Sequence, residues 1–134
     1  MELNNQKAVL IVEDENTLRI LLQTVFEDVG VKVFATSDGY EAIEILKDHK
    51  DEIKVLIADL GLPKLGGWDT FMMMRKINPN LQGILASGYF EANIKEELIK
   101  AGATDFIQKP YNTKLLVSKV REILYNDYDK SRPS

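Results

Sequence analysis

The chain alternates short apolar runs with segments whose apolar residues recur at helical spacing, and this alternation restricts the fold more than any other feature. Runs of strand character lie at about residues 8–12, 31–35, 55–58, 84–86 and 104–108. A segment of helical period follows each run, as where Leu18, Leu22, Val25 and Val29 share one face. Alternating strands and helices predict a mostly parallel sheet with helices on both faces.

No repeat, low-complexity tract or interior linker interrupts these units. We therefore expect a single α/β domain over residues 8–126, with flexible tails at residues 1–7 and 127–134. Residues with known capping preferences mark the expected helix ends. Gly30 is typical of a left-handed stop after the first helix. Asp38 with Glu41 resembles a capping pair for the second, Pro79 follows the third, and Asn112 can cap the fifth.

The composition of the strands predicts the strand order 2-1-3-4-5. The first, third and fourth runs are continuously apolar, as is typical of parallel strands that are covered on both faces. The second run contains Lys32, and the fifth contains Thr104, Asp105 and Gln108, which suits the edges of the sheet. In this order the topological switch point lies between the first and third strands, and ligands bind there, beyond the carboxyl ends of the strands.

Charged and polar residues follow four of the expected strands. Glu13 and Asp14 follow the first, Asp59 the third, Ser87 the fourth and Lys109 the fifth. Converging carboxylates repel one another and require a cation. Because the chain has no Cys and only one His, which falls in a predicted surface loop, the ligands would be oxygen atoms. Oxygen-only sites favour hard ions such as Mg²⁺ or Ca²⁺.

These residue types suit phosphoryl transfer, which needs mainly positioning and charge neutralisation. Asp14 and Asp59 could ligate the ion directly, a backbone carbonyl just after Asp59 could add a ligand, and Glu13 could act through water. Lys109 and Ser87 would offer an ammonium and a hydroxyl to phosphoryl oxygens. A carboxylate can accept the phosphoryl group, and Asp59 is the predicted acceptor because it is central. Its acyl phosphate would be temporary, since water hydrolyses it.

Composition narrows the class of protein. The 134 residues, of which 45% are hydrophobic and 28% charged, suit one soluble globular domain. A net charge of -4 gives no general attraction to nucleic acid or anionic membrane. The polar start has no signal-peptide apolar region, and no apolar run approaches the roughly 20 residues that span a bilayer. We expect a cytoplasmic protein without a membrane or direct nucleic-acid partner.

Short motifs in a fixed order make the chain resemble the receiver domains of two-component response regulators. The motifs are the acid pair Glu13-Asp14, Asp59 followed by Leu-Gly-Leu-Pro, the Gly66-Gly67 turn, Ser87-Gly88, and Phe106-Ile107-Gln108-Lys109-Pro110. Each motif is weak alone, but all of them in order at the expected strand ends are specific. The resemblance covers about residues 8–125 and implies a doubly wound, flavodoxin-like fold.

The resemblance also implies a mechanism. Phosphate would pass from a histidine kinase or phosphotransfer domain to Asp59 with Mg²⁺ as cofactor, for which Mn²⁺ or Ca²⁺ could substitute. The carbonyl of Gly61 would be the backbone metal ligand. Ser87 would swing toward the phosphoryl group, Phe106 would rotate inward, and the Lys109–Pro110 bond would be cis. Such a domain catalyses only its own phosphorylation and dephosphorylation, so the prediction is a signalling phosphoacceptor rather than an enzyme.

The chain departs from the family pattern at a few positions. The first acid is Glu13, which changes the reach of a water-mediated contact, and Leu62 replaces the more frequent Met. Phe106 lacks the hydroxyl of a Tyr, and it can equally be interpreted as a half-buried strand residue without a switch role. Gly61 and Tyr89 lie where the family tunes dephosphorylation.

Other functions fit parts of the pattern. A phosphatase of the haloacid dehalogenase type also uses an Asp at a strand end, but needs a second Asp where this chain has Gly61. A nucleotide- or flavin-binding module would need a glycine-rich phosphate loop, and neither Gly-x-Gly-x-x-Gly nor a loop ending Gly-Lys-Ser/Thr is present. A degenerate receiver that only docks partners would lack chemical residues that this chain has.

By resemblance, the fourth helix, fifth strand and fifth helix, around Lys95 to Lys119, form the surface that a downstream effector or a second copy in a homodimer would contact. No output segment follows the last expected helix. Two interpretations remain open, a stand-alone receiver and a receiver from a larger protein such as a hybrid sensor kinase.

Overall fold

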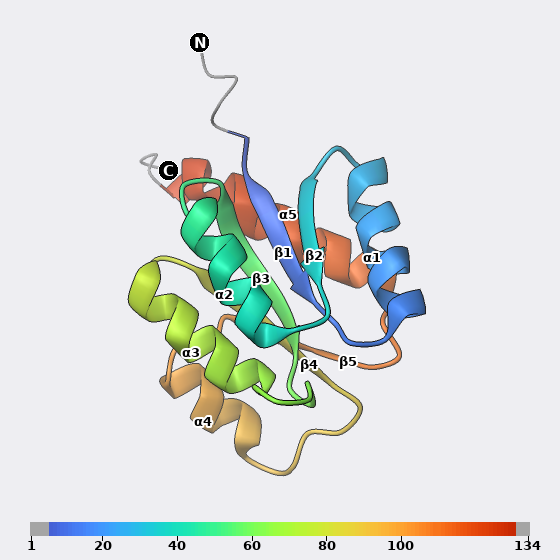
Figure 1. The fold of residues 1–134 in the computed structure, drawn as a ribbon, viewed down its shortest axis with the longest axis vertical. Helices are drawn as coiled ribbons and strands as arrows, with labels where there is room; N and C mark the ends of the chain where they lie inside the picture. Colours follow the sequence, from blue (N-terminus) through green and yellow to red (C-terminus); the bar gives the residue numbers. More distant parts are fainter. Residues whose placement is uncertain (1–5, 131–134) are drawn as a thin grey trace.

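The computed structural model describes residues 6–130, and the side chains of residues 6–125. Strands and helices alternate along the chain (Figure 1). The elements are β1 (Ala8–Val12), α1 (Asn16–Asp28), β2 (Lys32–Thr36), α2 (Gly39–Asp48), β3 (Ile53–Asp59), α3 (Gly67–Ile77), β4 (Gln82–Ser87), α4 (Ile94–Lys100), β5 (Asp105–Gln108) and α5 (Thr113–Lys130). All pairings are parallel, in the order β2-β1-β3-β4-β5, so the predicted fold and strand order are confirmed.

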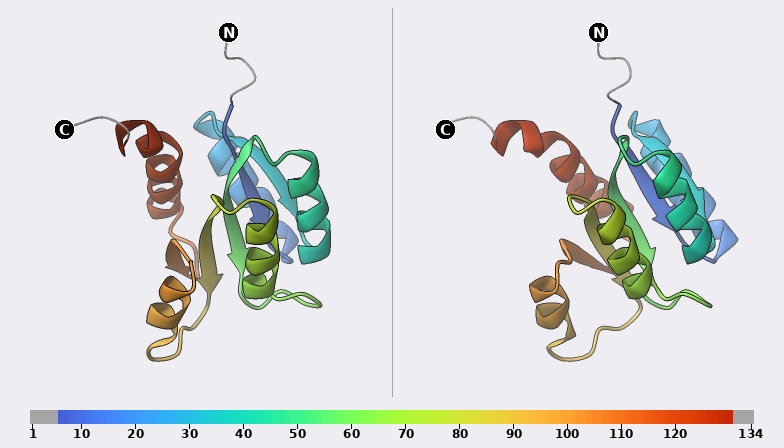
Figure 2. Two further views of the ribbon diagram at one scale, coloured as in Figure 1. Left: turned by 90° about the vertical axis from the view of Figure 1, so that its left-hand side faces the viewer. Right: turned by 60° about the vertical axis from the view of Figure 1, so that its left-hand side comes forward.

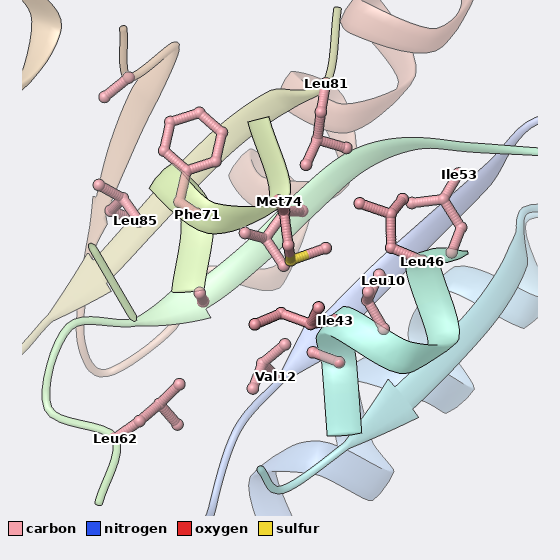
Figure 3. Close-up of a cluster of buried hydrophobic side chains, with 14 of the residues drawn as sticks. Leu10, Val12, Ile43, Leu46, Ile53, Leu62, Phe71, Met74, Leu81 and Leu85 are labelled. Atoms are coloured by element: carbon pink, nitrogen blue, oxygen red, sulfur yellow. The ribbon is translucent and has the colours of Figure 1, made fainter. Parts of the chain in front are cut away.

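Helices cover both faces of the sheet, as Figure 2 shows. Successive residues of a strand point to opposite faces, so β1 contributes to two separate cores. Val9 packs in one core with Phe26 of α1 and Val120 of α5. Leu10 packs in the other with side chains of α2 and α3, drawn in Figure 3. The central strands are therefore buried on both sides, and their ends provide rigid positions for polar side chains.

Three of the predicted helix ends are confirmed. Gly30 has a φ of 84°, in the left-handed region that favours glycine. The Asp38 side chain accepts from a backbone N–H in the first turn of α2, and Asn112 Oδ1 does the same at the start of α5. The role of Glu41 in the α2 capping pair differs from the prediction, because Glu41 makes no direct side-chain hydrogen bond to Asp38 in the described part of the chain. Thr36 lies between the two partners, since its hydroxyl accepts from the Asp38 N–H and donates to Glu41.

The last helix is longer than expected. It continues to Lys130 and so passes residue 126, where we placed the start of a tail. At the start of the fold, the Lys7 ammonium donates to the Leu124 carbonyl at 2.6 Å and joins the beginning of β1 to α5. The rest of the predicted tails, residues 1–5 and 131–134, lies outside the described residues. Within residues 6–130, no helix combines the length and the apolar character that a bilayer crossing requires.

Candidate functional site

The predicted site residues follow strands that end at one edge of the sheet. Asp59 is the last residue of β3, which lies between β1 and β4. The register pairs Val12 with Ala58 and Asp59 with Ala86, so the ends of these three strands are nearly level. Glu13 and Asp14 follow β1 directly, Ser87 is the last residue of β4, and Lys109 follows β5. The parallel sheet therefore gathers residues that are far apart in the sequence.

Three carboxylates and one ammonium meet at this edge. One oxygen from each of Glu13, Asp14 and Asp59 lies within 4.8 Å of the others, and these three residues are called the acidic rim. Lys109 Nζ lies 2.6 Å from Asp59 Oδ2 and 3.0 Å from Glu13 Oε1. One ammonium does not balance three carboxylates, and oxygen donors are those that Mg²⁺ prefers. The donor set thus fits the predicted ion.

Glu13 is held more firmly than the other acids. Its side chain is 1% exposed, and both carboxylate oxygens accept hydrogen bonds. Oε1 accepts from Lys109 and from the Tyr111 hydroxyl, the latter at 3.0 Å, while Oε2 accepts from the Glu15 N–H at 3.1 Å. A buried carboxylate needs such partners because it has lost its water. Tyr111 was not among the predicted site residues, although its position two residues after Lys109 was a usable signal.

Lys109 and Tyr111, the two side chains that donate to Glu13, both have raised pKa values. Burial alone would lower the pKa of the Lys109 ammonium, but its hydrogen bonds to Asp59 and Glu13 outweigh burial and raise the pKa. Burial raises the pKa of the Tyr111 phenol, and the negative charge of Glu13 raises it further. Both groups therefore keep their protons at neutral pH and act as donors.

Asp59 is fixed by its neighbours in the chain as well as by Lys109. Its Oδ1 accepts from the Gly61 N–H at 2.9 Å. The first residue of α3 lies against its main chain, because a Cβ added to Gly67 would be 2.3 Å from the Asp59 carbonyl oxygen. Glycine is therefore required at this point of the predicted Gly66-Gly67 turn. The proposed role of the Gly61 carbonyl as a metal ligand remains a prediction.

Ser87 and Phe106 lie on the expected strands, but their side chains contact residues outside the acidic rim. The Ser87 hydroxyl donates to the Tyr89 carbonyl at 2.8 Å, and within the described part of the chain no hydrogen bond joins it to Asp59 or Lys109. Phe106 is only 8% exposed and packs edge-to-face on Phe90, with ring centroids 5.4 Å apart. The main chains at the ends of β4 and β5 are linked, since the Lys109 N–H donates to the Ser87 carbonyl. The Lys109–Pro110 peptide bond is cis.

Comparison with known proteins finds a family model and relatives that agree with one another. A model described as the response regulator receiver domain matches residues 9–121. The chain is 33% identical over 118 residues to the chemotaxis protein CheY of Thermotoga maritima, covering 87% of this chain and 97% of that protein. It is 29% identical over 123 residues to the sensor kinase CckA of Brucella abortus, covering 92% of this chain. It spans only 13% of the length of that kinase.

Solved structures agree with this match. A response regulator receiver domain protein from Clostridium thermocellum has a TM-score of 0.82 at 24% identity, covering 91% of this chain and 97% of that one, a likeness of fold. The receiver domain of the Francisella response regulator 1452 has a TM-score of 0.79 at 26% identity, covering 94% and 99%. Because the family model spans most of the chain and the observed fold agrees with it, the chain belongs to the response regulator receiver domain family of two-component signalling.

Proposed function

We propose that this receiver domain accepts a phosphoryl group on Asp59 from a phosphohistidine of a histidine kinase or phosphotransfer domain. The observation that supports this best is the setting of Asp59. It belongs to the acidic rim, with Lys109 Nζ 2.6 Å from its Oδ2. Lys109 is thus placed to compensate charge on an incoming group. The domain modifies itself, so its role is that of a signalling phosphoacceptor.

Asp14 and Asp59 would hold Mg²⁺ directly, Glu13 would act through water, and the Gly61 carbonyl would complete the protein ligands. When bound, Mg²⁺ would neutralise charge between the Asp59 carboxylate and the phosphate, and Mn²⁺ or Ca²⁺ could substitute. The convergence of the three carboxylates within 4.8 Å supports this ligand set. Hard cations with oxygen ligands suit the absence of Cys from the chain.

In the proposed step, an Asp59 oxygen attacks phosphorus while the P–N bond breaks and its electron pair passes to the imidazole nitrogen. Lys109 exchanges its bond to Asp59 Oδ2 for one to a phosphoryl oxygen. Ser87 leaves the Tyr89 carbonyl and donates to another phosphoryl oxygen, so the hydroxyl exchanges one acceptor for another. Phe106 is the proposed second switch residue, and its contact with Phe90 offers a route toward α4.

The phosphorylated form would be recognised through the surface formed by α4, β5 and α5, from about Lys95 to Lys119. An effector or a second copy of the domain would bind there. The relatives show two arrangements of such a domain, one as nearly the whole of a protein and one as a small part of a sensor kinase. Either arrangement is compatible with the proposed chemistry.

Beryllofluoride, a phosphoryl mimic, tests the proposal. We expect the unmodified domain to bind it only when Mg²⁺ is present, and we expect Asp59→Asn to abolish binding because the covalent acceptor is lost. Fluorine NMR of bound fluoride measures the occupancy. Asp48→Asn, the same change at an exposed residue on the last turn of α2, is the matched control and should bind normally. Unchanged binding by Asp59→Asn would exclude Asp59 as the acceptor.

A further inference from the structure

Tyr111 joins the connection between β5 and α5 to the acidic rim. Its hydroxyl donates to Glu13 Oε1 at 3.0 Å across 98 residues of sequence. Its ring lies close to Lys109, whose Nζ is 5.6 Å from the ring centroid. The helix α5 begins two residues later, at Thr113. Tyr111 therefore contacts both the acid and the ammonium of the site, although the proposed chemistry gives it no role.

The contacts of Glu13 indicate what the Tyr111 hydroxyl does. Glu13 Oε1 has two donors, Lys109 and Tyr111, and Oε2 has one, the Glu15 N–H. In the proposed reaction Lys109 exchanges Asp59 Oδ2 for a phosphoryl oxygen, and the same movement would lengthen its bond to Glu13 Oε1. Tyr111 is not expected to follow Lys109, because its hydroxyl is carried by a rigid ring that is partly buried against the core. The hydroxyl then remains as the side-chain donor that holds Glu13 in place.

We propose that Tyr111 is a positioning residue, which fixes the orientation of Glu13 and thereby sets the affinity of the acidic rim for Mg²⁺. The inference rests on the proposed cofactor. Partners that orient a metal ligand are typically worth about 10- to 100-fold in metal affinity. Because Glu13 is expected to act through water, the effect of Tyr111 belongs at the low end of that range.

Tyr111→Phe removes the hydroxyl and keeps the ring, so it separates positioning from packing. We expect it to weaken Mg²⁺ binding about tenfold, measured by isothermal titration calorimetry of the intact chain. In the metal-free protein we expect the backbone amide resonance of Glu15 to shift, because that N–H donates to the same carboxylate. Tyr125→Phe, the same change at a half-exposed residue on α5, is the control and should alter neither quantity.

A second comparison tests whether Tyr111 acts through Glu13. In a Glu13→Ala background, Tyr111→Phe should change the Mg²⁺ dissociation constant by less than about twofold, since nothing remains to be positioned. A tenfold effect in that background, or parent-like Mg²⁺ affinity of Tyr111→Phe alone, would overturn the inference and leave the proposed function intact. Absence of Mg²⁺ binding by the parent chain would instead overturn the proposed cofactor, and the inference with it.

Discussion

Lys109 contacts two carboxylates of the acidic rim at once, through Asp59 Oδ2 and Glu13 Oε1. Its ammonium therefore reduces the repulsion between the acids when no other cation is near. The same positive charge opposes the approach of Mg²⁺. Lys109 thus has a different proposed role in each state of the domain. Before phosphorylation it is a counter-ion of the acids, and afterwards it is a partner of the phosphoryl oxygens.

Lys109→Ala separates these two roles. We expect the variant to bind Mg²⁺ at least as tightly as the parent, because a positive charge is removed from beside the ligands. We expect it to bind beryllofluoride weakly, because the phosphoryl oxygens lose their ammonium partner. Calorimetry and fluorine NMR measure the two affinities, with the exposed Lys114→Ala as control. Loss of Mg²⁺ affinity in Lys109→Ala would show that its role is misassigned.

At the scale of elements, the start of α3 is packed directly on the end of β3. Gly67 has no room for a side chain, since an added Cβ would lie 2.3 Å from the carbonyl oxygen and 2.8 Å from the carbonyl carbon of Asp59. Backbone atoms cannot rotate away as a flexible side chain can. This contact keeps the connection that contains Gly61 short and fixed, and with it the position of the Asp59 carboxylate.

Gly67→Ala should therefore destabilise the domain by about 1–3 kcal/mol, the usual range for overpacking. The higher helix propensity of Ala opposes this by at most about 1 kcal/mol, because the site is at the helix end. Urea denaturation measures the free energy of unfolding. Gly88→Ala is the control, because nothing lies within 4 Å of its added Cβ. Equal stability of the two variants would contradict the close approach of α3 to β3.

At the scale of the whole molecule, the sheet could be predicted because its order depends on a few strong local signals. Continuous apolar runs indicated β1, β3 and β4, and parallel strands necessarily bring Glu13, Asp14 and Asp59 to one edge. Contacts that depend on side-chain orientation across the sheet could not be predicted. The hydrogen bond from Tyr111 to Glu13 is one such contact.

The differences in the helices have similar causes. The extension of α5 to Lys130 was missed because the residues after 126 are mostly polar, so no apolar face marks them as helical. The insertion of Thr36 between Asp38 and Glu41 was missed because it depends on how β2 enters α2. Local propensity predicts that a helix begins there, but not which side chains complete the hydrogen bonds.

The global stability should fall at alkaline pH. The folded state raises the pKa values of Lys109 and Tyr111 above the ordinary 10.5 and 10.0. At high pH the folded state then holds more protons than the unfolded state, so the free energy of unfolding decreases as the pH rises above these ordinary values. Urea denaturation between about pH 9 and about pH 12 measures this slope. Tyr111→Phe should reduce the slope, and an unchanged slope would contradict the assignment.

The bond from Lys7 to Leu124 has a consequence for how the domain can be connected to other proteins. It brings the beginning of β1 beside Leu124 of α5, at the opposite end of the sheet from the carboxyl ends of the strands (Figure 1). A fusion partner, a surface tether or a fluorescent label attached close to Lys7, or to α5 close to Leu124, would therefore leave the acidic rim accessible.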